Sequence, residues 1–405
     1  MLDDFGQRIR DIILSEMDLS RELSDEEICD LIGSVVSREA RDRPMTIKDR
    51  AELERTIFNS LRKLDVLQEL VDDRDVTEIM VNGPNDIFYE KAGRIQRFKG
   101  HFSSEEKLED VIQQIVGRHN RVVNQASPIV DTRLSDGSRV NIVLNPISIG
   151  GSAVSIRKFP EHPMSMERLV EIEALSPGVA RLLQILTQAK YNIFISGGTG
   201  SGKTTFLNAL SQYIPDDERI ITIEDSAELQ LLGAKNIVRL ETRNANTDGV
   251  TPITIRDLIR TALRMRPDRI IVGECRGAEA LDMLQAMNTG HDGSLSTGHA
   301  NSPHDIISRI ETMVLQGQDF PLNAIRQQIA SGIDIIVQLG RLRDKSRRVL
   351  EISEVDGFMD GEIVLHTLYR FEETAVLDSG RIQGFLKKAG TLCHTDKLMA
   401  AGLSV

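Results

Sequence analysis

The sequence has few cysteines, which cross-link small proteins, and few aromatic residues, which stack against bases and sugars. It contains three cysteines and no tryptophan in 405 residues, and aromatic residues make up 4% of it. Cys29, Cys275 and Cys393 can form neither a disulfide framework nor a four-thiolate zinc site within one chain. With so few rings, surfaces that stack on bases or carbohydrates are not expected.

Long apolar runs and a net positive charge are also missing. No stretch of 18 uncharged apolar residues could span a bilayer, and the acidic N-terminal stretch has no apolar core of signal-peptide type. The 49 basic and 61 acidic residues give a net charge of -12, a poor basis for coating nucleic acid. We therefore expect a cytoplasmic protein with no nucleic-acid partner, and peripheral membrane association stays open.

What is present is typical of a globular protein with more than one domain. Hydrophobic residues make up 40% and charged residues 27%. Residues 1–72 show helical periodicity without a strand signal, and 73–159 mix strands, hairpins and a helix in a small α+β domain. Asp136-Gly137 lies between two alternating runs and predicts a two-residue hairpin turn.

The second half of the chain has the alternating pattern of a parallel α/β sheet. Residues 160–175 hold two prolines and little periodicity, so we predict a linker there. Apolar strand-like runs alternate with amphipathic helical runs over 176–370, which predicts a larger α/β domain. Residues 371–405 are predicted to be a C-terminal tail of hairpin and loop.

A glycine-rich stretch from Gly197 to Thr204 matches the phosphate-loop pattern GxxxxGK[ST] at every fixed position. Glycines let successive backbone N–H groups turn inward around phosphate oxygens, because no Cβ blocks the approach. Lys203 would place its charge near the β- and γ-phosphates, and the Thr204 hydroxyl would ligate Mg²⁺. A chance match is the alternative, but an apolar run precedes the loop and an amphipathic run follows it. The predicted ATP-binding residues are Gly198, Thr199, Gly200, Ser201, Gly202, Lys203, Thr204 and Thr205.

Acids and histidines flank three further predicted strands. Glu224, Glu274 and His299 end such strands, and His291 precedes the last one. Ligands of open α/β sheets sit outside the carboxyl ends of the strands, so we expect these side chains on the phosphate-loop edge. One carboxylate would orient or deprotonate the attacking water, and another would hold Mg²⁺ directly or through water; Glu274 and Glu224 are the candidates, and Glu274 is the predicted Mg²⁺ ligand beside Thr204. Any of the acids could instead be a solvated cap, and the histidines could be zinc ligands, although nothing nearby completes such a site.

Four segments in this region resemble a known family. GGTGSGKTT, ITIEDSAEL, LRMRPDRIIVGECRG and TGHDGSLSTGHANSP resemble the Walker A, Asp box, Walker B and His box of the ATPases of type II secretion, type IV secretion and type IV pili. PIVDTRLSDGSRVNIVL and VSIRKF extend the resemblance over most of 75–370. QAMNTGHDGS and AIRQQIASGIDIIVQLGRL resemble the CpaF-type (TadA) branch of tight-adherence (Flp) pilus assembly. No Asp ends the Walker B strand, where Glu274 is the only acid.

The resemblance implies a hexameric motor that hydrolyses ATP to drive pilus assembly or protein secretion. It implies a RecA-like P-loop ATPase domain behind the small α+β domain, and catalytic roles for Lys203, Glu224 and Glu274. His291 and His299 would sense the nucleotide. The implied partners are further copies of this chain and an inner-membrane platform protein, which places the motor peripherally on that membrane.

Arginines of the α+β domain are candidates for stabilising charge on the γ-phosphate. A two-residue turn at Asp136-Gly137 would pair Arg133 with Val140, so Arg133 and Arg139 would point to opposite faces. The family pattern favours Arg139 and Arg157. Solvated or salt-bridged strand arginines are the alternative.

Two other functions use the same nucleotide core. A nucleic-acid-stimulated P-loop motor is the first, against which the acidic balance and scarce aromatics argue. A scaffold that binds ATP without hydrolysing it is the second, against which the complete set Lys203, Thr204 and Glu274 argues.

We predict that Arg157→Ala lowers the rate of ATP turnover by about tenfold or more, because an arginine on the transferred phosphoryl group is worth about 10³ to 10⁵ in rate. The free energy of unfolding should change little. Steady-state phosphate release and urea unfolding measure the two quantities. Near-normal turnover by a variant that assembles to the normal size would contradict the role.

Overall fold

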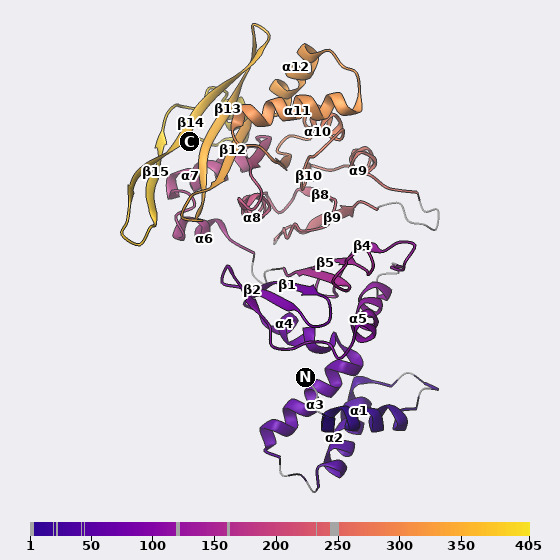
Figure 1. Ribbon diagram of the computed structural model, residues 1–405. Coiled ribbons are helices and arrows are strands. Elements are labelled where there is room, and N and C mark those ends of the chain that lie inside the picture. Colours follow the sequence, from indigo (N-terminus) through magenta and orange to yellow (C-terminus); the bar gives the residue numbers. More distant parts are fainter. Residues whose placement is uncertain are drawn as a thin grey trace. The chain divides into compact units, whose positions relative to one another are not determined.

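The structure is a computed structural model that describes residues 4–18, 20–21, 23–41, 43, 45–118, 122–159, 163–231, 233–243 and 251–405. Contacts divide the chain into two units, Met1–Glu161 and His162–Val405, and each is described by itself (Figure 1). Residues 160–162, where the predicted linker begins, lie outside the described residues.

The first unit begins with three helices that share a small core of their own. They are α1 (Asp4–Glu16), α2 (Asp25–Glu39) and α3 (Ile47–Arg62). Ser24 and Thr46 each form a capping box at the start of α2 and α3, which satisfies backbone N–H groups that have no partner within the helix. The apolar faces meet in a cluster of buried residues: Ile9, Ile13, Ile28, Ile32, Val35, Val36 and Ile57.

A six-stranded antiparallel sheet follows, after η1 (Asp65–Leu67) and α4 (Gln68–Asp72). Its strands run in the order β3-β2-β1-β6-β5-β4. They are β1 (Val76–Asn82), β2 (Ile87–Lys91), β3 (Arg94–Arg97), β4 (Ile129–Arg133), β5 (Arg139–Val143) and β6 (Ala153–Arg157). Buried side chains alternate along β4, β5 and β6, and α5 (Glu105–Gly117) packs its apolar residues into the same core.

The hairpin between β4 and β5 differs from the predicted two-residue turn. The N–H of Gly137 donates to the Leu134 oxygen and the N–H of Leu134 to the Ser138 oxygen, and Gly137 has a φ of 89°. A left-handed glycine after a tight turn adds one residue to the connection, as in a glycine bulge. Arg133 therefore pairs with Arg139 rather than with Val140, and the prediction that these two arginines face opposite ways is wrong.

The second unit is built on a nine-stranded sheet in the order β15-β14-β13-β12-β7-β11-β10-β8-β9. The strands from β12 to β9 in that order are parallel, and β13, β14 and β15 extend them antiparallel. The strands are β7 (Ile193–Gly197), β8 (Arg219–Glu224), β9 (Asn236–Glu241), β10 (Arg269–Val272), β11 (Leu295–Gly298), β12 (Ile335–Arg341), β13 (Arg347–Met359), β14 (Glu362–Val376) and β15 (Ile382–Lys388).

Helices cover both faces of this sheet, which gives it two hydrophobic cores. Residues of α6 (Met166–Glu171), α7 (Pro177–Gln188), α8 (Lys203–Ser211) and α13 (Asp396–Ala401) enter one core. Residues of α9 (Ile255–Ala262), α10 (Ala280–Asn288), α11 (Pro303–Gly317) and α12 (Leu322–Gly332) enter the other. The predicted α/β class, with a parallel sheet behind an α+β domain and N-terminal helices, is confirmed.

Two segments differ from their predicted descriptions. The predicted linker 160–175 contains α6, whose Met166 and Leu169 are buried in the core of the second unit. The predicted tail begins inside β14, and β14 and β15 form the edge of the large sheet. Both segments are parts of the second unit because their apolar residues pack into it.

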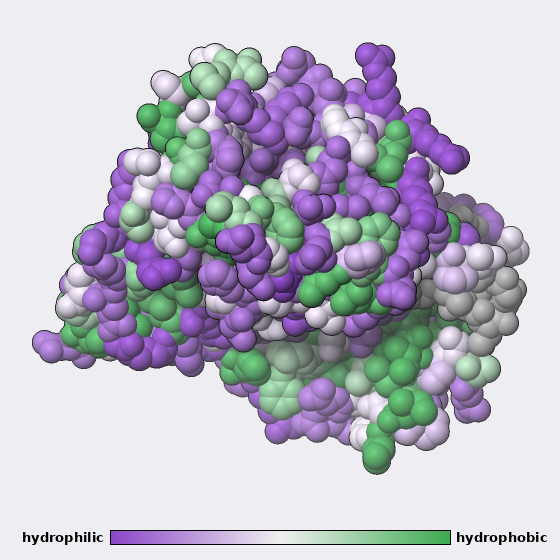
Figure 2. Space-filling view, turned by 90° about the horizontal axis from the view of Figure 1, so that it is seen from above, coloured by the Kyte–Doolittle hydropathy of each residue, from purple (hydrophilic) through white to green (hydrophobic). Residues whose placement is uncertain are grey.

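The visible surface is largely hydrophilic (Figure 2), as expected for a chain in which 27% of the residues are charged. In the space-filling view, hydrophilic side chains predominate over the visible face and hydrophobic ones gather in smaller patches (Figure 2). None of the helices among the described residues is long and apolar enough to cross a membrane.

We predict that Arg269→Ala destabilises the protein by about 3 to 5 kcal/mol, the usual loss when a buried ion pair is broken. The Arg269 guanidinium is fully buried and donates to the Glu218 carboxylate, to the Thr187 oxygen at 2.8 Å and to the Gly293 oxygen at 3.2 Å. Urea unfolding measures the change. Arg264→Ala, at an exposed position nearby, is the control and should shift stability by less than about 0.5 kcal/mol.

Candidate active site

The phosphate loop leaves a buried strand at the centre of the large sheet. Every residue of β7 is buried, and β11 and β12 flank it as parallel partners. A Cβ on Gly197 would lie 2.5 Å from the Ser201 Oγ and 2.8 Å from the Leu339 oxygen, so only glycine fits there. Gly202 has a φ of 93° and caps α8, which begins at Lys203. The loop therefore ends at a helix N-terminus, the arrangement that favours a bound anion.

The Lys203 ammonium lies inside this loop. It is 7% exposed, and its Nζ donates to the Gly197 oxygen at 3.1 Å and the Gly198 oxygen at 3.2 Å. Burial lowers the pKa of Lys203, and the nearby Glu274 carboxylate opposes that shift. The buried cation is thus held by carbonyl oxygens that a phosphate can replace.

A chain of contacts runs from Lys203 to the ends of β11 and β10. Both ring nitrogens of His299 lie 3.4 Å from the Lys203 Nζ, and its Nε2 lies 2.6 Å from the Glu274 Oε1. The other Glu274 oxygen accepts from Arg276 at 2.6 Å. Burial, and then the Lys203 charge, lower the pKa of His299. The structure therefore brings Lys203, His299 and Glu274 together as predicted.

The segment that carries Glu274 is tied to β11 and anchored in the core. The Cys275 N–H donates to the Thr297 oxygen at 2.8 Å, and the Thr297 hydroxyl donates to the Gly273 oxygen at 2.8 Å. The Cys275 side chain is buried in the apolar cluster, and burial raises the pKa of its thiol well above the usual value. The cysteine that follows Glu274 is therefore a neutral core residue that fixes the carboxylate in place.

Glu224 is also buried at the carboxyl edge of the sheet, but its carboxylate accepts hydrogen bonds from backbone N–H groups. Its Oε2 accepts from the N–H of Glu228 at 2.7 Å and of Leu229 at 2.9 Å. A Cβ on Gly273 would lie 2.8 Å from the Glu224 Cγ, so the side chain lies against the segment that leads to Glu274. Its contacts indicate that it shapes the turn after β8.

His291 lies at the opposite edge of the sheet. It precedes β11, whose four residues span roughly 13 Å, whereas His299 follows that strand. Close by, the Gly293 oxygen accepts from Arg269, the first residue of β10. The prediction that His291 lies on the phosphate-loop edge is wrong, because a residue before a parallel strand lies at its amino end.

The candidate arginines of the first unit form a row across its sheet. Cα pairing places Arg133 opposite Arg139, Arg139 opposite Arg157, and Arg157 opposite Glu78. Paired residues share a face, and the intervening Val140 and Ile156 are buried in the core, so the row lies on the face away from that core.

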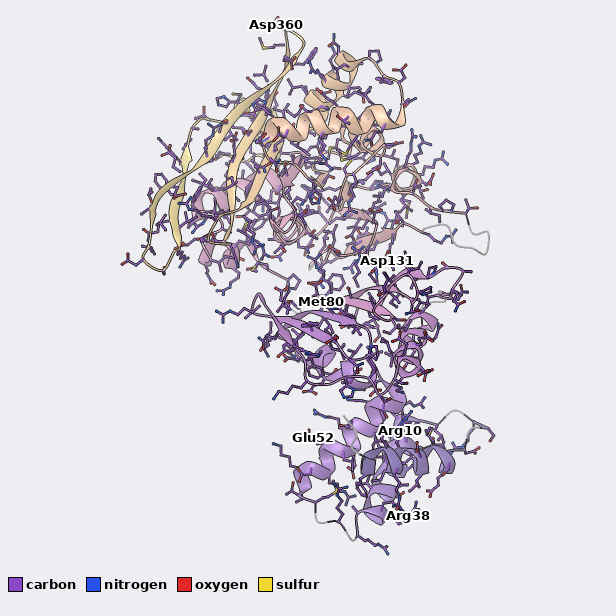
Figure 3. The ribbon with its side chains drawn as sticks, in the orientation of Figure 1. Arg10, Arg38, Glu52, Met80, Asp131 and Asp360 are labelled. Carbon is purple, nitrogen blue, oxygen red and sulfur yellow. The ribbon has the colours of Figure 1, made fainter. Side chains whose placement is uncertain are left out.

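A second row of paired residues lies next to the arginines on the same face, and two of its members are labelled in the side-chain view (Figure 3). Asp131 pairs with Asn141, Asn141 with Ser155, and Ser155 with Met80. Figure 3 labels Asp131 and Met80, two members of this neighbouring row. An Arg139 Nη lies 3.8 Å from the Asp131 Oδ1, so the carboxylate lies close to the arginine row.

Two arginines at the phosphate loop were not predicted. Arg276 contacts Glu274 and lies 3.8 Å from the Asp225 carboxylate, and Arg347 of β13 donates from its Nε to the Gly200 oxygen at 2.8 Å. Arg276 follows Glu274 by two positions and could have been inferred from that spacing. Arg347 lies more than 140 positions from Gly200 in sequence, and only the antiparallel strand brings it there.

The remaining loop residues differ in exposure. Thr204 is half-buried in the first turn of α8, whereas Thr199, Gly200 and Thr205 are exposed. A hydroxyl beside the loop lysine is the kind of hard oxygen ligand that Mg²⁺ takes together with phosphates and water. Among the described residues, no group of three His, Cys, Asp or Glu could by itself hold a metal ion.

The chain is similar to known proteins over most of its length. The family model described as "Type II/IV secretion system protein" matches residues 60–383. The type IV secretion system protein PtlH of Bordetella pertussis is 33% identical and aligns with 73% of this chain and 94% of its own length. The conjugal transfer protein TrbB of Rhizobium radiobacter is 31% identical, with coverages of 81% and 98%. The pilus retraction motor PilT with bound ADP superposes with a TM-score of 0.54 at 22% identity, covering 81% of this chain and 83% of that one, which shows the shared fold.

We predict that His299 makes the stability of the protein depend on pH. Because its folded pKa is lowered below 6.5, only the unfolded chain takes up the extra proton as the pH falls below that value, and the free energy of unfolding decreases. His299→Gln should remove this part of the decrease. Urea unfolding at about pH 7 and about pH 5.5 measures it. His304→Gln, at an exposed position, is the control; an equally flattened profile in that variant would contradict the assignment.

Proposed function

Because the chain belongs to the type II/IV secretion system protein family, we propose that it is a hexameric ATPase motor for tight-adherence (Flp) pilus assembly or protein secretion at an inner-membrane platform. The chain binds and hydrolyses ATP, and motors of secretion and pilus systems are the general class to which it belongs. The tight-adherence system, the ring of six and the platform partner are the specific parts of the proposal.

The observation that carries the proposal is the Lys203 ammonium, buried in a glycine loop and in contact with His299 and, through it, Glu274. A triphosphate in the loop would take the place of the Gly197 and Gly198 oxygens at the ammonium. The loop N–H groups and the α8 terminus would bind the same phosphates. Charge stabilisation of this kind is the main contribution of proteins to phosphoryl transfer.

Glu274 and His299 are proposed to act on the attacking water. Glu274 is held from one side by His299 and from the other by Arg276, so its oxygens have fixed directions. It would accept a hydrogen bond from the water and align it with the γ-phosphate. The neutral imidazole of His299, beside Lys203, would detect the loss of the γ-phosphate. Glu224 would position this segment through the turn that it caps.

Mg²⁺ fits this arrangement. Thr204 would hold the ion directly, and Glu274 would hold it through water, because Mg²⁺ retains several waters when it binds beside phosphates. When bound, the ion neutralises charge on the β- and γ-phosphate oxygens.

Arg139 and Arg157 are proposed to supply further positive charge to the γ-phosphate. The family resemblance supports both, and their direct pairing on one face of the sheet lets them act on one ligand. Arg133 stands in the same row, so the corrected register adds a third arginine to this group.

A second candidate function is a nucleic-acid-stimulated motor on the same core. The relative TrbB is named for conjugal transfer, which supports this candidate. The net charge of -12 supports the protein-transport motor. Phosphate release measured with and without DNA, at low and at physiological salt, distinguishes them, since salt-sensitive stimulation by DNA would favour the second.

We predict that Lys203→Ala lowers ATP turnover by about a hundredfold or more, because the transferred phosphoryl group loses its nearest fixed cation. Steady-state phosphate release measures the effect. Lys235→Ala, which removes an exposed lysine paired with Asp216, is the matched control and should keep normal turnover. Turnover by Lys203→Ala as fast as by the parent chain would overturn the proposed function.

We also predict that nucleotide shifts the chain towards hexamers, since a ligand that bridges subunits stabilises the assembled state. Mass photometry with and without a non-hydrolysable ATP analogue tests this at micromolar concentration. A chain that stays monomeric under both conditions would contradict the ring.

A further inference from the structure

A second pocket lies within the first unit, apart from the phosphate loop. Residues of α1, α3, the β2–β3 hairpin and the segment leading into α5 line it, and its volume is about 600 Å³. Cavities of about 300 to 1,000 Å³ are typical of small-molecule sites. Figure 3 labels Arg10, which reaches this pocket from α1.

Direct hydrogen bonds hold the walls of the pocket together. Lys107 of α5 donates from its Nζ to the Ser60 oxygen at 3.0 Å, and Gln114 donates to the Arg62 oxygen at 3.0 Å. Both acceptors belong to the last turn of α3. The helices and the α+β part therefore meet at a fixed junction, and the pocket is formed at that junction.

The lining is basic in a chain that is acidic overall. Five cationic side chains contribute to it, against the two carboxylates of Asp65 and Glu69: Arg10, Arg55, Arg97, Lys99 and Lys107. Lys107 lies 4.0 Å from Asp65, and Arg97 lies 2.6 Å from Asp86. Burial raises the pKa of the Asp65 carboxyl, and the Lys107 and Arg10 charges oppose that shift, so Arg10 also acts on Asp65. With five cations against two carboxylates, the lining keeps a net positive charge that attracts a negatively charged ligand.

Arg10 carries the clearest sign of an absent acceptor. Its Nε is buried from solvent and has no hydrogen-bond partner among the described residues. A buried donor without an acceptor costs about 1 to 3 kcal/mol. A guanidinium presents its N–H groups in a planar fork that matches the oxygens of a phosphate. A phosphate in the pocket would satisfy the donor.

The pocket also offers an aromatic wall. Tyr89 and Phe98 pack edge to face with ring centroids 6.2 Å apart, and both line the pocket. The Tyr89 hydroxyl donates to the Gln96 side chain at 3.1 Å, which orients its ring. Rings of this kind bind a flat apolar or heteroaromatic group beside the charged one.

We propose that this pocket binds a phosphorylated small molecule of nucleotide size. Arg10, Arg55 and Lys99 contact the phosphate, and the Tyr89–Phe98 pair packs against its ring. Since α1 and nearly all of α3 lie outside the residues matched by the family model, the site is an addition to the motor core.

Titration calorimetry on full-length protein tests the proposal, with AMP, GMP and inorganic pyrophosphate as probes. Lys203→Ala serves as the background to weaken binding at the phosphate loop. We expect at least one probe to bind saturably, and Arg10→Gln with Arg55→Gln to weaken that binding by tenfold or more. Arg8→Gln is the matched control, because Arg8 lies on the same helix, is 73% exposed and does not line the pocket.

Other outcomes overturn the proposal. They are no saturable binding of any probe, binding of unchanged strength in the double variant, which would belong to the phosphate loop, or an equal loss in Arg8→Gln. If the double variant unfolds, Lys99→Gln replaces it, since Lys99 is exposed and its replacement leaves the helix packing intact. Lys99→Gln should weaken binding severalfold, and unchanged affinity there would count against the site.

Discussion

The structure of the second unit depends on one electrostatic constraint, the burial of the Lys203 ammonium at the carboxyl end of β7. A buried cation needs close oxygen partners, and the backbone of the glycine loop supplies them at Gly197 and Gly198. The loop begins from a rigid core, because the strand before it is buried and Ser201 and Leu339 leave no room for a side chain at Gly197. Helices on both faces keep water from the strands that carry the loop.

The same ammonium connects the phosphate loop to the neighbouring strand ends. His299 stands between Lys203 and Glu274, and Arg276 holds the far side of the carboxylate. Arg347 adds a contact from the antiparallel side of the sheet. A change of charge in the loop, such as the arrival or loss of a phosphoryl group, therefore acts directly on groups that follow β10 and β11 and on Arg347 at the start of β13.

The features of this fold that differ from the predictions have definite physical causes. The pairing of β4 with β5 differs from the prediction by one residue because Gly137 takes a left-handed conformation that lengthens the turn. An Asp-Gly sequence fits both the two-residue turn and this longer turn, so the sequence does not distinguish them. His291 comes before β11 and therefore lies at the amino end of a parallel strand, away from the edge that holds the phosphate loop. The edge strand β9 has half-exposed residues and lacks the continuous apolar run of the central strands, so its sequence carries only a weak strand signal.

The sequence alone determined the α/β class, the phosphate loop and the roles open to Lys203 and Thr204, because these follow from local demands on backbone conformation and from apolar periodicity. It also placed Glu274 and His299 at strand ends. Only the tertiary structure decided which polar groups meet: the His299–Glu274 contact, the use of Glu224 to cap a turn, and the approach of Arg347. Those meetings depend on strand order and side-chain packing between segments far apart in the chain, which no local pattern records.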